Sequence, residues 1–137
     1  MARKTLRQKV EGRIARGWDD GVFLTREFVD LAGKDQVLRA LRGLVRDGEL
    51  IRLGYGVYGR ALKSRLTNEP VLASPDGFAG AARRALNKLG VKWQPTAEER
   101  AYNEGRSTQV PVNPAVRVKD RFSRRLRYRG TELIIER

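Results

Sequence analysis

Apolar residues at the start of the chain recur with a helical period. Leu6, Val10 and Ile14 are spaced four residues apart, which predicts an amphipathic helix over residues 3–16, ended by Gly17. The apolar run 22–24 that follows predicts a short strand.

Two further helical patterns follow, separated by a glycine. The first begins at Thr25, a good N-cap residue, and stops at Gly33; the second begins at Asp35, also an N-cap type, and ends at Asp47-Gly48. On the helical wheel of the second pattern, apolar residues occupy one arc and polar residues the opposite arc. The apolar arc holds Val37, Leu38, Ala40, Leu41, Leu44 and Val45, and the opposite arc holds Gln36, Arg39, Arg42, Gly43 and Arg46.

A hairpin is predicted directly after this second helix. Residues 50–53 form the first strand, Gly54-Tyr55-Gly56 reverses the chain because glycine tolerates a positive φ, and residues 57–58 return. Two helices followed by a hairpin are typical of a winged helix-turn-helix, so residues 1–62 are predicted to form such a domain and to close a small core of their own.

Residues 61–74 show no clear period and contain Pro70, so they are expected to connect two units across the surface. In the second unit, 63–137, a helix capped by Ser74 is predicted over 75–89, and Thr96 with Glu99 has the form of a capping box for another helix that ends near residue 104. Short alternating patterns at 91–93, 110–112, 116–118, 125–129 and 132–136 predict antiparallel strands. The expected fold class is α+β: a winged helix-turn-helix followed by a small α+β unit.

Charge favours a polyanionic partner. The chain has 29 basic and 16 acidic residues, a formal charge of +13 and a pI near 11.0. Residues 1–62 carry 13 basic and 8 acidic groups, and residues 63–137 carry 16 and 8. The second half therefore also needs a role.

The sequence contains neither cysteine nor histidine, which removes the commonest general base and the usual soft metal ligands. An enzyme would have to use carboxylate or lysine chemistry, for example at Glu98, Glu99 or Glu104, and helix capping explains these acids better. We therefore expect no enzymatic activity, cofactor or metal. No apolar stretch of about 18 residues occurs, so a cytoplasmic protein without membrane contact is expected.

The candidate site is the polar arc of the second helix with the residues around it. Arginine can bridge O6 and N7 of guanine and glutamine can pair with adenine, so the predicted base-reading residues are Gln36, Arg39, Arg42 and Arg46. The predicted phosphate contacts are Thr25, Arg26 and Lys34, with Arg52, Tyr55 and Arg60 acting from the hairpin. A solvated helix face is the alternative, because arginine forms helices on any surface. The neighbouring helix and hairpin favour DNA.

A second basic run contains Arg124, Arg125, Arg127 and Arg129. Alternation would place Arg125, Arg127 and Arg129 on one face of a strand. Such a face fits phosphate binding, and equally an edge strand whose charge prevents aggregation.

The run VFLTREFVDLAGKDQVLRALRGLVRDGELIRLGYGVYGRA resembles the N-terminal winged-helix domains of AbiEi-like antitoxins, bacterial proteins of toxin–antitoxin pairs linked to phage defence. The later segment AYNEGRSTQVPV is similar to short members of the same group. The resemblance implies a domain that represses its own operon at inverted repeats, and a C-terminal domain that opposes a nucleotidyltransferase-like toxin. The expected function is a sequence-specific regulator that binds double-stranded DNA; the alternative is an RNA-binding or protein-interaction module acting through the basic C-terminal half.

Overall fold

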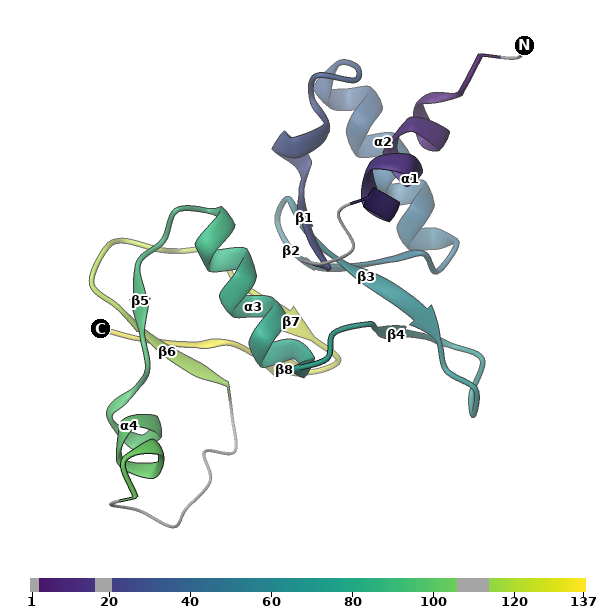
Figure 1. The fold of residues 1–137 in the computed structure, drawn as a ribbon. Coiled ribbons are helices and arrows are strands. Elements are labelled where there is room, and N and C mark those ends of the chain that lie inside the picture. Colours follow the sequence, from purple (N-terminus) through teal and green to yellow (C-terminus); the bar gives the residue numbers. More distant parts are fainter. Residues whose placement is uncertain (1–2, 17–20, 106–113) are drawn as a thin grey trace.

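The computed structural model describes residues 3–16, 21–105 and 114–137, and this part of the chain has an α+β fold, as predicted (Figure 1). Its helices are α1 (Leu6–Arg16), the 3-10 turn η1 (Thr25–Phe28), α2 (Lys34–Arg46), α3 (Gly77–Lys88) and α4 (Ala97–Asn103). Its strands are β1 (Val22–Leu24), β2 (Leu50–Gly54), β3 (Val57–Lys63), β4 (Pro70–Leu72), β5 (Trp93–Gln94), β6 (Ala115–Val118), β7 (Arg127–Tyr128), β8 (Thr131–Glu132) and β9 (Ile134–Glu136).

The first sheet is built around β3. The beginning of β3 lies between β1 and β2, both antiparallel to it, and its end pairs with β4. Helices α1 and α2 pack on one side of this sheet (Figure 1). The predicted apolar arc of α2 is confirmed, because Val37, Leu41 and Leu44 are fully buried and the other three members are half-buried.

The predicted helix over 25–33 is wrong, since only η1 forms there. The backbone N–H of Thr25 donates to the carbonyl of Gly56 (3.1 Å), so this residue is held by the hairpin and is not an N-cap. Leu24 takes the cap position, and its N–H donates to Glu27 Oε1 (2.8 Å). The cap of α2 is Gly33, which places Asp35 inside the first turn.

The expected connector over 61–74 is partly a strand. β3 continues to Lys63, and β4 pairs with it from Pro70 to Leu72. Pro70 is the first residue of β4, where the missing N–H breaks no sheet ladder, so proline did not exclude a strand here.

In the second half, β6 pairs with β5 in antiparallel fashion but with β9 in parallel, which corrects the prediction of antiparallel strands throughout. The predicted strand 125–129 shrinks to β7, because Leu126 is buried in the core and Arg129 adopts a left-handed φ of 51°. The predicted strand 132–136 is interrupted at Leu133, whose N–H donates to the carbonyl of Leu126 (2.8 Å). The strand predicted at 110–112 lies outside the described residues.

The helix starts of the second half agree in part with prediction. α3 begins after Asp76, and the Ser74 hydroxyl bonds the Asp76 carboxylate (2.8 Å) instead of capping the helix. Thr96 caps α4 as expected, accepting from the N–H of Glu99 (3.2 Å). The Glu99 carboxylate instead pairs with Arg83 at 2.7 Å.

One hydrophobic core contains residues from both sides of position 62. Strand residues alternate between the two faces of the first sheet: Phe23 and Tyr58 face α1 and α2, whereas Val22, Leu24 and Val57 face the other side. On that side they join residues of α3, β6 and the C-terminal segment, namely Ala81, Ala82, Ala85, Leu86, Val116, Val118, Leu126 and Leu133. The first 62 residues therefore do not bury all their apolar side chains by themselves.

Candidate nucleic-acid interface

The outward face of α2 is exposed as predicted. Gln36, Arg39, Arg42 and Arg46 are all exposed, and the Arg46 side chain is 78% accessible beside Asp47 (3.4 Å). Within the described residues, no hydrogen bond or ion pair holds the other three side chains. These groups are therefore available to an external partner.

The four residues do not all lie on the same side of α2. Gln36, Arg39 and Arg46 border a shallow depression between α1 and α2. Arg42 lies on the opposite side, where α2 faces the β2–β3 hairpin. Taking 100° per residue and the mean direction of Val37, Leu41 and Leu44 as the core, Arg39 and Arg46 lie within about 15° of the outward direction.

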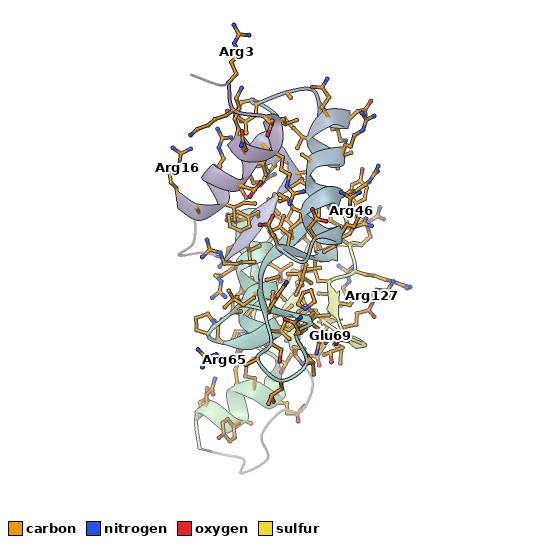
Figure 2. The ribbon with its side chains drawn as sticks, turned by 90° about the vertical axis from the view of Figure 1, so that its right-hand side faces the viewer. Arg3, Arg16, Arg46, Arg65, Glu69 and Arg127 are labelled. Carbon is orange, nitrogen blue, oxygen red and sulfur yellow. The ribbon has the colours of Figure 1, made fainter. Side chains whose placement is uncertain are left out.

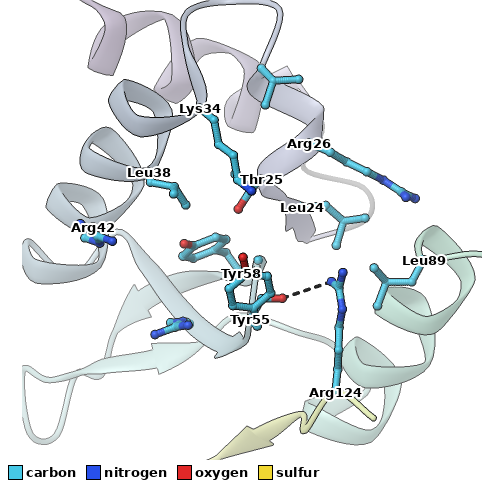
Figure 3. A pocket seen from close by; sticks show the side chains of 13 residues that line it. Leu24, Thr25, Arg26, Lys34, Leu38, Arg42, Tyr55, Tyr58, Leu89 and Arg124 are labelled. Carbon is cyan, nitrogen blue, oxygen red and sulfur yellow. Dashed lines mark hydrogen bonds between the residues drawn. The ribbon is translucent and has the colours of Figure 1, made fainter. Parts of the chain in front are cut away.

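A groove of about 340 Å³ separates α2 from the hairpin, and we call it the hairpin groove (Figure 3). It brings together predicted site residues from both halves of the chain. Its lining is Leu24, Thr25, Arg26, Val29, Lys34, Leu38, Arg42, Arg52, Tyr55, Gly56, Tyr58, Leu89 and Arg124. Five of these are basic and none is acidic.

The hairpin tip is held against the C-terminal segment. Gly56 has a φ of 67°, which completes the predicted turn, and Tyr55 projects from it with 64% of its surface exposed. Arg124 donates to the Tyr55 carbonyl (3.3 Å), and its guanidinium lies 5.6 Å from the centre of the Tyr55 ring. Figure 3 shows Arg124 extending into the groove from the side opposite Lys34.

Two predicted phosphate contacts are wrong or incomplete. Arg60 is half-buried and donates to the carbonyl of Ile14 (3.2 Å), so it fixes α1 to the sheet on the far side from the groove. Thr25 is only 8% exposed, and its hydroxyl is buried without a hydrogen-bond partner among the described residues. Neither side chain presents a polar group to a nucleic-acid backbone at the surface.

The second basic run does not form one face. Arg124 lies in the hairpin groove, while Arg129 donates to the carbonyl of Pro70 (3.0 Å). Arg125 is 78% exposed and lies 3.9 Å from Glu132. Arg127 is exposed and projects to the same side of the molecule as Arg46 (Figure 2).

Several basic residues of α1 are occupied by acids. Arg7 bonds Asp47 and Glu49, and Arg13 bonds Asp30, so both arginines fix α1 to neighbouring segments. These guanidinium groups hold the pKa of Asp47 and of Asp30 below the usual range. The positive charge of α1 is thus partly neutralised within the fold.

Sequence reasoning missed the apolar floor of the hairpin groove. The apolar pattern places Leu38 and Leu89 in the core and singles out nothing at Val29, yet all three line the groove. The one available signal was Leu38, which lies at the edge of the apolar arc next to Arg42.

In the described ranges, no group of three or more His, Cys, Asp or Glu side chains could hold a metal ion. No helix there is long and apolar enough to cross a membrane. No protein-family model matches the chain, and no curated protein sequence matches it either.

Proposed function

We propose that the protein is a non-enzymatic regulator that binds double-stranded DNA, in which α1, η1, α2 and the first sheet act as a winged helix-turn-helix. α2 would enter the major groove and the β2–β3 hairpin would be the wing. One observation carries the proposal: the exposed arginines of α2 lie beside a hairpin groove with five cations and no acid. A polyanion would neutralise these charges.

The geometry divides the work among the arginines. Arg39 and Arg46 point most directly away from the core, so they would approach base edges. Arg42, Lys34 and Arg52 line the hairpin groove and would contact phosphates between helix and wing. Asp35, the single acid within α2, lies in its first turn, where it favours the positive end of the helix dipole.

Fluorescence anisotropy tests this proposal. The full chain is titrated with a labelled duplex from the region upstream of its own gene, with a shuffled duplex of equal length, and with an RNA hairpin, each at several salt concentrations. Specific binding should exceed shuffled binding by about 10³-fold or more. Affinity should also fall by about one power of salt concentration per phosphate contact. Equal affinity for both duplexes at every salt would refute sequence-specific reading, and preference for the RNA hairpin would favour an RNA-binding module.

Matched arginine variants locate the reading head. Arg39→Ala should cost about 1 to 3 kcal/mol on the upstream duplex and much less on the shuffled one. Arg65→Ala is the control, because Arg65 is an exposed arginine of the β3–β4 turn, away from α2 (Figure 2). An equal loss in both variants would show a general charge effect and no base reading.

The resemblance to AbiEi-like antitoxins supports a further part of the proposal. The protein would repress its own operon at inverted repeats and oppose a nucleotidyltransferase-like toxin encoded beside it. Co-expression with the neighbouring reading frame tests this: the protein should restore growth that the neighbour alone arrests. An adjacent gene of another kind, or arrest that persists, would remove the antitoxin role and leave the DNA-binding proposal to its own assay.

A further inference from the structure

The hairpin groove is deeper than a surface that only meets a DNA backbone needs. Its volume of about 340 Å³ lies at the lower end of the range for small-molecule pockets, roughly 300 to 1,000 Å³. It is bounded by η1, α2, the β2–β3 hairpin and the C-terminal end of α3, so it lies where the two halves of the chain meet. Ligand pockets favour such junctions.

The floor of the groove is apolar. Leu24 and Tyr58 are buried beneath it, and Leu38 and Leu89 are half-buried in its walls. Val29, at the margin, exposes 47% of its surface. Concave apolar surface left open to water favours an apolar ligand group.

The rim is cationic and partly pre-arranged. Figure 3 shows Lys34 and Arg124 pointing into the groove from opposite walls. Arg124 is oriented by its hydrogen bond to the Tyr55 carbonyl and by the Tyr55 ring, and Arg26 is held by the carbonyl of Lys88. Fixed donors of this kind bind an anion at a lower entropic cost than free side chains do.

A buried polar atom also lines the groove. Thr25 is more than nine-tenths buried, and its hydroxyl has no hydrogen-bond partner in the described part of the chain. Buried hydroxyls are nearly always bonded, and this one can donate or accept. It offers a polar contact at the inner end of an otherwise apolar floor.

We propose that the hairpin groove is a binding site for a small amphipathic anion, a compact apolar or aromatic body that carries one carboxylate, sulfonate or phosphate. The apolar body lies against Leu38, Tyr58 and Leu89, and the anionic group bonds Arg124 and Lys34. This site goes beyond the proposed DNA-binding function, because it takes a second kind of ligand. Since the same cations face a DNA backbone in that proposal, ligand and duplex compete for them.

The full chain with 8-anilino-1-naphthalenesulfonate as probe tests the site. Its fluorescence should rise saturably, with one probe bound per chain. Arg124→Gln should weaken binding by about tenfold, the loss expected for a hydrogen bond to a charged group at a half-open site. Leu38→Trp should abolish binding by filling the groove.

Matched controls separate this site from general attraction to a basic protein. Arg127→Gln removes an equally exposed arginine, and Leu66→Trp adds the same ring at a residue that is 96% exposed on the β3–β4 turn; both should leave the affinity within about twofold. N-phenyl-1-naphthylamine, which lacks the sulfonate, should bind more weakly and be insensitive to Arg124→Gln.

Two results would overturn the site: probe binding that does not saturate, or saturable binding that both groove variants leave unchanged. Loss of duplex affinity in these variants without any probe binding would show that the groove serves nucleic acid alone. Probe binding is measured without DNA, so it stands or falls independently of the proposed function. Duplex added afterwards should release the probe, and a probe that stays bound would refute competition.

Discussion

Replacing Gly54 with alanine tests how the hairpin is held by the C-terminal segment. A Cβ on Gly54 would lie 2.5 Å from the backbone oxygen of Arg125 and 2.9 Å from Cδ2 of Leu126. Ordinary contact begins near 3.4 Å, so the two backbones would have to separate by about 0.9 Å. Leu126 is buried and its carbonyl accepts from Leu133, so the segment has little freedom to move.

The expected effect has two parts of opposite sign. Overpacking of this kind costs about 1 to 3 kcal/mol. Replacing a glycine whose φ is not left-handed returns about 0.4 to 1 kcal/mol by restricting the unfolded chain. The net destabilisation should be about 1 to 2 kcal/mol, which lowers a urea midpoint by about 0.5 to 1.5 M.

Gly43→Ala is the matched control, since it makes the same chemical change without the clash. Its Cβ would lie 3.8 Å from a terminal nitrogen of Arg46 and 3.9 Å from one of Arg7, both at flexible side-chain ends. Inside α2 this variant should gain about 0.5 to 1 kcal/mol. Urea unfolding followed by circular dichroism compares the two variants. A Gly54→Ala midpoint at or above that of the unmodified protein would refute the close packing of hairpin and C-terminal segment.

Three further outcomes follow from the geometry. Arg125→Ala with Arg127→Ala should weaken upstream and shuffled duplexes alike and reduce the salt slope by up to about one unit for each phosphate interaction that the change removes, as anisotropy titrations would show. Asp47→Asn should lower the melting temperature at pH 7 but not at pH 2.5. Arg7 depresses the native pKa of Asp47 below 3.8, so the stabilisation is present above that value and disappears as pH falls through the lower native pKa. A fragment of residues 1–62 should lack a cooperative thermal transition, because Val22, Leu24, Leu53 and Val57 no longer have their partners in α3 and beyond; a sharp transition would contradict this.

Local periodicity predicted the elements that a single strong pattern defines. The buried stripe of α2 and the pairing of β1 with the hairpin were correct, because period 3.6 and period two are visible in short windows. Helix starts were less accurate, since Thr25 is an N-cap type that a backbone bond to Gly56 holds elsewhere. The strand 125–129 failed for a similar reason: Leu126 is drawn into the core, and the arginines around it follow different directions.

The hairpin groove could not be predicted, because no window of sequence contains it. Tyr55 and Arg124 are 69 residues apart, and only the shared core brings them together. The signal in the sequence was limited to the basic character of each residue, which fits solvent exposure just as well. A pocket needs the floor as well as the rim, and the floor residues look like ordinary core residues.

The second half acquires a role from this packing that its charge alone does not suggest. Of its run of four arginines, only Arg124 reaches the groove, and it does so by holding the hairpin tip. Lys88 at the end of α3 donates to the carbonyl of Val22 (2.7 Å) and to Glu27 (3.0 Å), which fixes the strand and the turn that precede α2. Since α3 and the C-terminal segment touch both walls of the groove, they set the distance between α2 and the hairpin. On the proposed function, that distance decides whether helix and wing can reach the same duplex, so the basic C-terminal half acts first as a spacer and only secondarily as a source of charge.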